Sequence, residues 1–459
     1  MARLFGTDGI RGLANKELTA KLAFEIGRAG ARILIKENQV PRILIANDTR
    51  LSADMLEAAL VAGMCSMGAH VISAGVVPTP AVAYLVRKYE FEAGVMVSAS
   101  HNSFEDNGIK FFDSNGFKLK DELEDQIEAL ILENPEFSQT FTGSRIGQKY
   151  VARSAMKDYV DYLVSTLNGA DLSGLRVALD CANGATYQLA PAVFEKLGAT
   201  VMAINTSPNG MNINRNCGST HPQDLLRLVA EAPEAKKYDL AFAFDGDGDR
   251  CFAADENGNL IDGDMIMSII GCHMKENGKL KHNTIVTTIM ANLGFFMMAK
   301  ENGIETVKTK VGDRYVLEEM TKNKFNLGGE QSGHIIFSDY ATTGDGILTA
   351  LQLARIVKIA KSRGEKLSQL NTKMKPMPQV LVGAKIDNKL KKRIMEHETL
   401  KTETEKLENK FEGRGRVLVR PSGTEPLIRV MLEGEDLKEI TAEAERLKKI
   451  LENLAVGLA

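Results

Sequence analysis

A pattern that recurs three times along the chain constrains its fold more than any other feature. Each copy consists of an apolar, β-branched run, a turn rich in Asn, Asp or Gly, a helical segment, a glycine and a second apolar run. The copies start at Arg42, Arg176 and Thr284. Runs that are apolar on both faces are typical of central strands in a sheet that helices cover. The pattern therefore predicts an α/β protein with three repeated α/β units, each a mixed sheet covered by helices.

Changes in composition divide the chain further. At about 150 residues per domain, 459 residues suggest three or four domains. A connector at 134–147 rich in Ser, Thr and Pro leads to a helix expected over 150–167, a turn lies at 255–259, and Pro376 and Pro378 follow a long helix. We expect a hinge within 371–378.

The segment after this hinge differs in character from the three repeats. A Lys/Glu-rich stretch at 385–410 precedes two expected strands and an amphipathic helix from 436 to about 454. This order is typical of a smaller α+β domain. The predicted domains are therefore 1–150, 151–255, 256–371 and 372–459.

Charge and cysteine content exclude several classes of protein. Lys and Arg total 57 against 60 for Asp and Glu, so neither a nucleic acid nor an acidic membrane surface is an expected partner. The five cysteines are far apart and contain no CxxC pair, which argues against a disulfide framework and a zinc ribbon. The uncharged stretch 61–86 is interrupted by glycines and prolines, and the N-terminus lacks the features of a secretory signal. We expect a cytoplasmic protein.

The strongest sign of chemistry is an acidic loop, Asp245-Gly-Asp247-Gly-Asp249-Arg250, which follows an apolar run. Three carboxylates at alternate positions with glycines between them can converge on one cation, and hard oxygen ligands suit Mg²⁺ or Ca²⁺. An EF-hand loop would have Gly where Arg250 stands and would follow a helix. The alternative is a solvated acidic turn, although carboxylates packed this densely repel one another.

A second loop carries Ser98-Ala-Ser100-His101-Asn102 after an apolar run. It can present a nucleophilic serine, and Lys110 returns on the next expected strand as a proton carrier or a stabiliser of charge. The G-x-S-x-G elbow of hydrolases is missing from the sequence, and a Ser/His turn taken alone is more often a hydrogen-bonded loop.

A third loop reads Arg420-Pro-Ser422-Gly423-Thr424-Glu-Pro-Leu-Ile-Arg429. Two hydroxyls, a glycine that lets backbone N–H groups approach, and two guanidinium groups predict a site for a phosphate dianion. It is not a nucleoside-triphosphate loop, because GxxxxGK[ST] does not occur in the sequence. An ordinary Pro-Ser-Gly turn is the alternative.

Two further glycine-rich segments carry polar groups. In the segment 328–334, glycines frame Glu330, Ser332 and His334, which can hydrogen-bond to neighbouring hydroxyls of a sugar, although a plain turn explains the glycines equally well. Near the start, the segment 5–12 is too rich in glycine and polar residues to be a core strand. Arg11 within it is a candidate contact for an anion.

Taken together, five motifs resemble the α-D-phosphohexomutase family, in this order and across nearly the whole chain. They are Gly6–Gly12, Ser98–Asn102, Asp245–Arg250, Gly329–His334 and Arg420–Glu425. The resemblance implies four domains arranged around a central cleft. The sequence FGTDGIRG, the Ser-Ala-Ser-His form of the serine loop and Gly-Glu-Gln-Ser-Gly-His are most similar to bacterial members that act on glucosamine phosphates.

The same resemblance assigns roles to individual residues. Ser100 would carry a phosphoryl group, one oxygen of which joins Asp245, Asp247 and Asp249 in holding one Mg²⁺ ion. Lys110 and Arg11 would lie beside the phosphoserine, with His101 as a further catalytic residue. Substrate contacts would come from Arg250, Glu330, Ser332 and His334, and the phosphate that is not transferred would be bound by Arg420, Ser422, Gly423, Thr424 and Arg429. Ser103 departs from the family, which usually has Pro at this place.

The implied reaction interconverts glucosamine 6-phosphate and glucosamine 1-phosphate through a sugar bisphosphate, which is also the activator, and supplies amino sugar for the cell wall. Bacterial relatives imply a homodimer. Three rivals stay open: the same chemistry on glucose or mannose phosphates, a phosphatase that lets water attack the phosphoserine, and a protein that binds Ca²⁺ or a sugar phosphate without catalysis.

Overall fold

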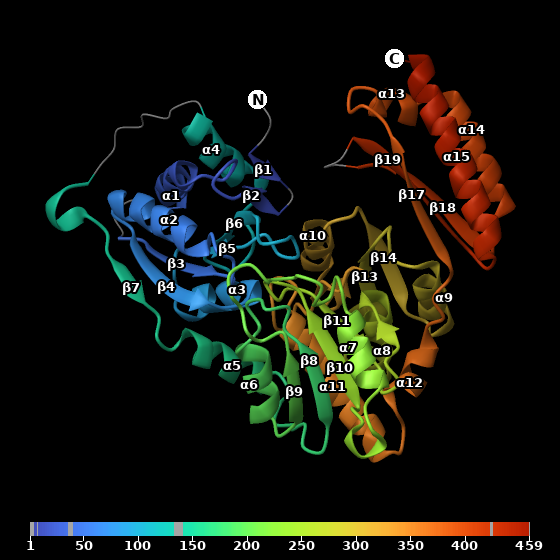
Figure 1. Ribbon diagram of the computed structural model, residues 1–459, viewed down its shortest axis with the longest axis horizontal. Coiled ribbons are helices and arrows are strands. Elements are labelled where there is room, and N and C mark those ends of the chain that lie inside the picture. Colours follow the sequence, from blue (N-terminus) through green and yellow to red (C-terminus); the bar gives the residue numbers. More distant parts are fainter. Residues whose placement is uncertain (1–3, 7, 35–39, 133–140, 423–425, 459) are drawn as a thin grey trace. The chain divides into compact units, whose positions relative to one another are not determined.

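The computed structural model describes residues 4–6, 8–34, 40–132, 141–422 and 426–458. Contacts within the chain divide it into two compact units. The first contains residues 1–290 and 304–372, and the second contains 291–303 and 373–459. Figure 1 shows the course of the chain and the labels of its helices and strands. Among the described residues, no helix has the length and apolar character needed to cross a bilayer.

The first unit begins with a seven-stranded mixed sheet in the order β1-β2-β6-β5-β3-β4-β7. Pairs β3·β4, β3·β5 and β4·β7 are parallel, whereas β5·β6, β2·β6 and β1·β2 are antiparallel. The strands are β1 (Phe5–Gly6), β2 (Gly9–Leu13), β3 (Arg42–Asn47), β4 (His70–Val76), β5 (Ala93–Val97), β6 (Asp106–Asp113) and β7 (Lys149–Val151).

Helices cover both faces of this sheet. Ile43, Ile45, Val95 and Val97 join one apolar core with residues of α1 (Ala20–Leu34) and α2 (Ala53–Ser66), while α3 (Thr79–Lys88) packs on β3 and β5. The alternation of strand side chains between the two faces explains why β3 and β5 are apolar throughout. The remaining helices near this sheet are α4 (Asp121–Leu132) and α5 (Ala155–Ser165).

Two smaller sheets complete the first unit. Their orders are β12-β11-β10-β8-β9 and β14-β13-β15-β16. The strands are β8 (Arg176–Asp180), β9 (Thr200–Ile204), β10 (Leu240–Phe244), β11 (Cys251–Ala254), β12 (Leu260–Ile261), β13 (Thr284–Thr288), β14 (Glu305–Thr309), β15 (Gly328–Gly329) and β16 (Ile335–Ile336). The helices are α6 (Leu189–Lys196), α7 (Gln223–Ala230), α8 (Gly263–Glu276), α10 (Asp313–Asn323), α11 (Gly346–Ser362) and α12 (Leu367–Leu370).

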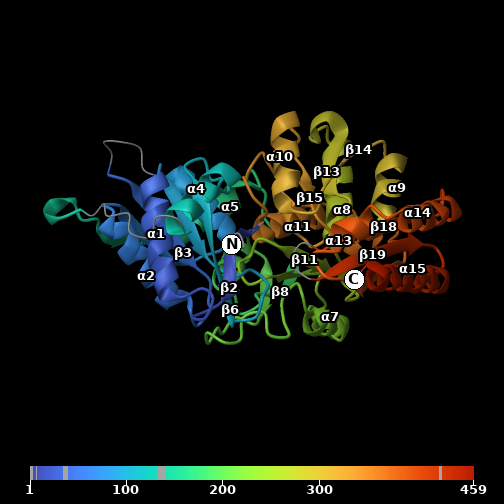
Figure 2. The ribbon, with the colours of Figure 1, turned by 90° about the horizontal axis from the view of Figure 1, so that it is seen from above.

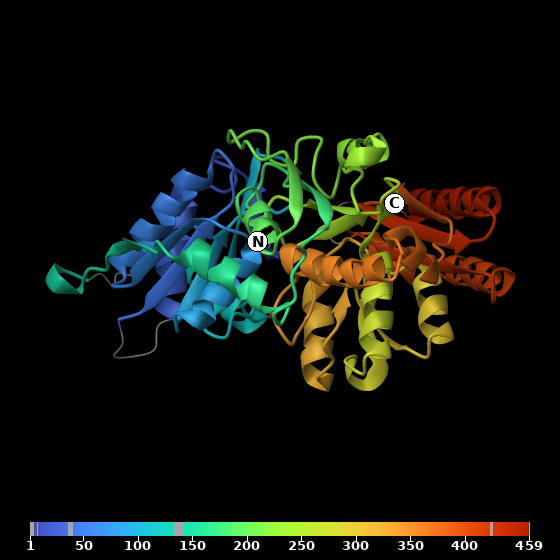
Figure 3. The ribbon, with the colours of Figure 1, turned by 90° about the horizontal axis from the view of Figure 1, so that it is seen from below.

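The sheet that contains β13 shows why the first strand of a repeat is apolar on both faces. On one face of β13, Val286 packs with Val316 and Met320 of α10; on the other, Ile285 lies against Gly271 of α8. Figures 2 and 3 show the helices of this part of the chain beside its strands. The predicted strand pairs of the three repeats are confirmed as β3·β4, β8·β9 and β13·β14, all parallel. The second strand of each pair is less buried than the first, because β9 and β14 are edge strands and β4 is followed only by β7.

The second unit is a three-stranded antiparallel sheet, β17-β19-β18, with helices. Its elements are α9 (Leu293–Glu301), β17 (Gln379–Lys385), α13 (Lys391–Met395), α14 (Glu398–Lys410), β18 (Gly415–Pro421), β19 (Leu427–Gly434) and α15 (Leu437–Leu458). Ile428, Val430 and Leu432 form its core with Ile440 and Leu447 of α15. It has the predicted α+β character. Single turns of 3₁₀ helix elsewhere are Gly143–Arg145, Glu234–Lys236, Lys281–Asn283 and Asn371–Lys373.

Two local predictions were wrong, and a third was incomplete. The helix expected over 150–167 starts only at Ala155, because Tyr150 lies in the short strand β7 that pairs with β4. The segment 5–12, expected to be no core strand, supplies β1 and β2, with Phe5 and Ile10 buried in the core. The two strands expected after 385–410 are confirmed as β18 and β19, but the prediction missed a third strand, β17, which begins directly after Pro378.

The four domain boundaries stay predictions. The division between the two compact units falls between Thr372 and Lys373, and α9 belongs with the second unit although it sits in the third repeat of the sequence. Asn292, at the start of α9, explains this placement: its side-chain amide donates to the Met377 carbonyl oxygen at 3.0 Å and accepts from the Met377 amide at 2.9 Å.

Candidate active site

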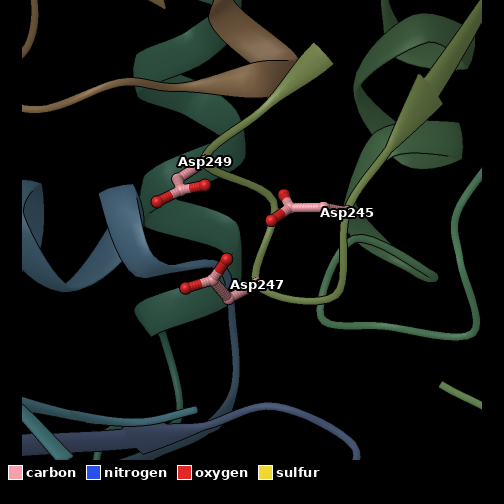
Figure 4. A group of neighbouring side chains, drawn as sticks. All are labelled: Asp245, Asp247 and Asp249. Carbon is pink, nitrogen blue, oxygen red and sulfur yellow. The ribbon is translucent and has the colours of Figure 1, made fainter. Parts of the chain in front are cut away.

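The acidic loop joins β10 to β11, which form an antiparallel hairpin. Asp245, Asp247 and Asp249 are buried, and one oxygen of each lies within 4.8 Å of the others (Figure 4). The glycines between them are needed for this convergence. A Cβ on Gly246 would lie 2.5 Å from the Ser100 carbonyl oxygen, and Gly248 has a φ of +70°.

The electrostatics of the three carboxylates call for a cation. Burial, together with the charges of Asp249 and Asp247, raises the pKa of Asp245 well above its ordinary value. One oxygen each of Asp247 and Asp249 is buried without a hydrogen-bond partner. Buried carboxylate oxygens with no donor fit a hard divalent ion, as predicted from the loop.

The serine loop follows the buried strand β5. Ser100 is 1% exposed and has a φ of +53°, a left-handed conformation that non-glycine residues adopt rarely. Its hydroxyl donates to Asp245 Oδ2 at 2.6 Å, so the serine and the acidic loop meet as predicted. His101 Nδ1 lies 3.5 Å from Ser100 Oγ. Burial, with the charges of Arg250 and Arg11, lowers the pKa of His101 to about 4.

Basic residues from β6 and β2 line the other side of the acidic loop. Lys110 is 2% exposed and its ammonium lies 2.8 Å from Asp247 Oδ2 and 3.0 Å from Asp8 Oδ2. Burial opposes its charge, but Asp247 and Asp8 raise the pKa of Lys110 above its ordinary value. Arg11 stands opposite Gly108 of β6 and pairs with Asp8. Both predicted cations therefore lie at the site.

The segment expected to bind a sugar is the turn of the β15–β16 hairpin. His334 Nδ1 lies 3.4 Å from Asp249 Oδ2, and its Nε2 accepts from the Gly344 amide at 3.0 Å. Glu330 accepts from the Gly312 amide at 3.1 Å, and burial raises the pKa of its carboxyl. The Ser332 hydroxyl oxygen is buried without a hydrogen-bond partner. Arg250 Nε is 3.9 Å from Asp249 Oδ1.

The predicted phosphate loop belongs to the second unit. Arg420 on β18 and Arg429 on β19 are direct cross-strand partners. Burial, and then the like charge of Arg429, lowers the pKa of Arg420, which favours an anion between the two. Ser422 is 6% exposed, and its carbonyl accepts from Lys391 at 2.7 Å. Gly423 and Thr424 lie outside the described residues.

Several residues of the site were missed by the sequence reasoning. Lys118 pairs with Asp8 at 2.5 Å and with Asp313 at 2.6 Å, so two carboxylates share one half-buried cation. Asp48 and Arg50 hold the serine loop from the end of β3. The sequence did carry a signal for Asp48 and Arg50. Both follow the first strand of the first repeat, in the same kind of polar turn that carries Ser100 after β5.

Comparison with known proteins places the chain in a family. Four family models match in sequence order. Three describe alpha/beta/alpha domains I, II and III of phosphoglucomutase/phosphomannomutase and match residues 2–137, 157–258 and 262–377. The fourth describes the C-terminal domain and matches residues 381–450.

Full-length relatives share more than half of the sequence. A phosphoglucosamine mutase of Clostridium novyi is 56% identical over 455 residues, covering 99% of this chain and 100% of the relative. One of Acetivibrio thermocellus is 56% identical over 453 residues, covering 98% of this chain and 99% of the relative.

Solved structures share the fold. A phosphoglucomutase/phosphomannomutase family protein of Burkholderia thailandensis matches with a TM-score of 0.81 at 23% identity, over 98% of both chains. The N-acetylphosphoglucosamine mutase of Aspergillus fumigatus, solved with GlcNAc-6P and magnesium, matches with a TM-score of 0.69 at 18% identity, over 98% of this chain and 96% of that one. The family and the buried triad together support a metal cofactor for this chain. The chain belongs to the phosphoglucomutase/phosphomannomutase family, the α-D-phosphohexomutases, and is an isomerase most similar to the phosphoglucosamine mutases.

Proposed function

We propose that this enzyme interconverts glucosamine 6-phosphate and glucosamine 1-phosphate through a phosphoserine at Ser100. One observation carries the proposal: Ser100 Oγ donates to Asp245 Oδ2 at 2.6 Å, within a triad of buried carboxylates. The serine therefore lies directly at the carboxylates that could hold a cation, and phosphoryl transfer depends on positioning and on positive charge at the transferred group. The choice of glucosamine is supported by the names of the relatives that are 56% identical over their full length.

The metal would be one Mg²⁺ ion held by Asp245, Asp247 and Asp249 and by an oxygen on Ser100. When bound, it supplies positive charge to the phosphoryl oxygens, on which charge accumulates in the transition state. The two unpartnered oxygens of Asp247 and Asp249 are the groups that such an ion would satisfy.

Of the two roles that the sequence left open for Lys110, its contacts support charge stabilisation. Held between Asp247 and Asp8, with its pKa raised, Lys110 is charged at neutral pH and suits charge stabilisation. His101, with its pKa lowered to about 4, is neutral and lies 3.5 Å from Ser100 Oγ, where it can accept a proton. Arg11 adds a second positive charge.

The proposed reaction has two transfers. The bond between Ser100 Oγ and phosphorus breaks as O1 of glucosamine 6-phosphate attacks, which gives glucosamine 1,6-bisphosphate. The bisphosphate turns over, and Ser100 Oγ then takes the phosphoryl group from O6 and leaves glucosamine 1-phosphate. Free sugar bisphosphate would act as the activator by phosphorylating Ser100.

Binding of the sugar would use the two remaining loops. Arg250, Glu330, Ser332 and His334 would contact the sugar hydroxyls, and the contacts of Arg250 and His334 with Asp249 in the first unit support this assignment. The phosphate that is not transferred would be bound by Arg420, Ser422, Gly423, Thr424 and Arg429, and the paired arginines support this part. Because the sugar is held by either end in turn, this phosphate site must accept two orientations of the substrate. We therefore propose a central cleft between four domains and a hinge within 371–378.

The finer biological setting is part of the proposal. The balanced charge supports a sugar phosphate rather than a nucleic acid as partner. The five cysteines form no disulfide with one another, which fits the reducing cytoplasm. We also propose a homodimer and a supply of amino sugar to cell-wall synthesis.

The second candidate is phosphoglucomutase or phosphomannomutase activity. The descriptions of the four matching family models favour it. The chemistry at Ser100 and the triad would be the same, since these substrates differ only at C2 of the sugar.

The test is a ³¹P NMR time course with glucosamine 6-phosphate, Mg²⁺ and a catalytic amount of glucose 1,6-bisphosphate. We expect the phosphomonoester signal of C6 to decline as a C1 signal appears, with no inorganic phosphate. Release of inorganic phosphate without a C1 signal would identify a phosphatase and contradict the proposal. A parallel time course uses glucose 6-phosphate. Conversion of glucose 6-phosphate without conversion of glucosamine 6-phosphate would favour the second candidate.

A further inference from the structure

Arg50 is a buried arginine that none of the five motifs contains, and its guanidinium lies against the loop that carries Ser100. It follows β3, which pairs in parallel with β5, so Arg50 and Ser100 stand at the carboxyl ends of neighbouring strands. Arg50 Nη2 donates to the carbonyl oxygens of Ser100 at 2.8 Å and Asn102 at 3.0 Å. Nη1 donates to the carbonyl oxygens of Asp106 at 3.0 Å and Ser103. One planar group thus holds four carbonyls of the loop.

The fifth N–H of the guanidinium is also used. Arg50 Nε donates to Asp48 Oδ2 at 2.8 Å, and both side chains are fully buried. The same oxygen of Asp48 accepts from Ser98 Oγ at 2.6 Å, and Ser98 Oγ accepts from the Ser100 amide at 2.9 Å. Both the amide and the carbonyl of Ser100 are therefore connected to the Asp48–Arg50 pair. Removing an ion pair from water costs free energy. Here that cost is offset, because every N–H of the Arg50 guanidinium donates a hydrogen bond.

The network acts on a strained residue. With a φ of +53°, Ser100 occupies a conformation that persists only where the surroundings over-determine it. Asn214 Nδ2 also donates to the Ser100 and Asn102 carbonyl oxygens, at 2.8 and 3.0 Å. Two side chains from separate segments therefore fix the same two carbonyls.

We propose that Arg50, paired with Asp48, is a positioning residue that holds the Ser100 backbone so that its hydroxyl points at Asp245. Phosphoryl transfer depends on alignment, and displacement of a reacting group by about 1 Å costs on the order of 10²-fold in rate. The inference rests on the proposed function, since it takes Ser100 as the residue that carries the phosphoryl group. Arg50 itself acts through the loop and not on the substrate.

The test is Arg50→Lys in the full-length enzyme. The substitution keeps a positive charge beside Asp48, but a single ammonium cannot reach four carbonyls at once. We expect kcat to fall at least tenfold while KM changes less than twofold, with phosphorylation of Ser100 by glucose 1,6-bisphosphate slowed in parallel. In a crystal structure of the variant, we expect Ser100 to leave the left-handed region.

Two further variants separate positioning from stability. Glu57→Gln is the matched control, because Glu57 is a buried carboxylate that accepts from Asn47 Nδ2 at 2.7 Å, beside Asp48. Its other hydrogen bonds come from Ser73 and Lys149, outside the serine loop. It should lower the thermal midpoint and leave kcat unchanged. Asn214→Ala removes the other donor to the Ser100 carbonyl, and it should lower kcat with KM unchanged even if Arg50→Lys fails to fold.

The outcomes are distinguishable. The proposal would be overturned if Arg50→Lys lowers the thermal midpoint but leaves both kcat per folded molecule and the φ of Ser100 unchanged. If the unmodified enzyme converts no hexose phosphate, the proposed function fails. The crystal structure then decides the positioning role alone, because a Ser100 backbone that stays in place without the guanidinium contradicts it and a displaced one supports it.

Discussion

At the scale of single residues, the proposed chemistry depends on direct hydrogen bonds from the serine and from a lysine to the acidic loop. Ser100 Oγ donates directly to Asp245 Oδ2, and Lys110 contacts Asp247 in the same loop. Each of these side chains is almost fully buried, so their charges act on one another with little screening by water. Removal of one group should therefore change the reaction more than the fold.

Ser100→Ala removes the oxygen that would carry the phosphoryl group. We expect kcat to fall by a factor of at least about 10³, whereas the lost hydrogen bond costs only about 1 kcal/mol of stability. The measurement is the rate of hexose phosphate conversion together with thermal unfolding. Ser103→Ala, an exposed side chain in the same loop, is the control and should keep its activity. Parent-like activity of Ser100→Ala would remove this residue from the mechanism.

Asp247→Asn tests the metal site. A ligand that binds only the folded protein raises the thermal midpoint of unfolding, and the rise grows with the concentration of the ligand. Mg²⁺ should therefore stabilise the unmodified enzyme. The variant should need at least about tenfold more Mg²⁺ for the same rise, because one carboxylate charge is lost. Asp255→Asn is the control, since this buried aspartate caps a turn through the Asn257 and Asn259 amides. Identical Mg²⁺ dependence in Asp247→Asn would refute the ligand assignment.

At the scale of secondary-structure elements, the ends of strands and helices position the site. The acidic loop and the serine loop both follow buried strands, and Asp345 is the N-cap of α11, beside the hairpin that carries His334. Asp345 Oδ1 accepts from the Leu348 amide at 2.9 Å, and its Oδ2 accepts from Tyr159 Oη at 2.5 Å. This N-cap therefore links α11 to α5.

The N-cap predicts a dependence of stability on pH. Burial raises the pKa of Asp345 from 3.8 to about 6. Between these values the folded state binds the proton more tightly than the unfolded state, so this group destabilises the fold increasingly as the pH rises through the window. Asp345→Asn keeps an acceptor for Leu348 and carries no charge. Relative to the parent, its stability should improve by up to about 3 kcal/mol between pH 4 and pH 7.5.

The check is the difference in thermal midpoint between parent and Asp345→Asn at the two pH values, in one metal-free buffer. The difference should shift in favour of the variant at pH 7.5. The same difference at both values would show that Asp345 does not titrate in this window.

The elements also show what sequence can and cannot predict. The first strand of each repeat was predictable because it is apolar on both faces, as with β3 and β13. The edge strands β1 and β7, and β2 beside β1, were not, since strands at or next to an edge tolerate the glycines and polar residues that argue against a strand. In the site, Ser100 and the three aspartates could be found from their motifs. Arg50 could not be assigned a role, because its contacts depend on β3 lying beside β5.

At the scale of the whole molecule, the chain consists of two units, and the phosphate loop lies on the second. Arg420 and Arg429 face each other across β18 and β19. Burial and the like charge of Arg429 lower the pKa of Arg420, which suits a site for an anionic ligand. Under the proposed function, the first unit would bind the transferred phosphate and the second unit the phosphate that is held.

Arg420→Gln tests that division of labour. Loss of a charge-assisted hydrogen bond to phosphate, about 1.5–3 kcal/mol, should lower kcat/KM by roughly 10- to 100-fold, mainly through KM. Phosphorylation of Ser100 should need a higher bisphosphate concentration but should still reach completion at saturation. The control is Arg414→Gln, because Arg414 is exposed and pairs with Glu439 on the same unit. An unchanged KM in Arg420→Gln would exclude this arginine from substrate binding.

The central claim is that the enzyme is a mutase for glucosamine phosphates. The most direct test is to compare kcat/KM for glucosamine 1-phosphate, glucose 1-phosphate and mannose 1-phosphate, with Mg²⁺ and a matching bisphosphate. We predict a preference of at least about 10² for glucosamine 1-phosphate, or about 2.7 kcal/mol in transition-state binding. Equal or better use of glucose or mannose phosphate would contradict the claim and assign the enzyme to general hexose phosphate metabolism.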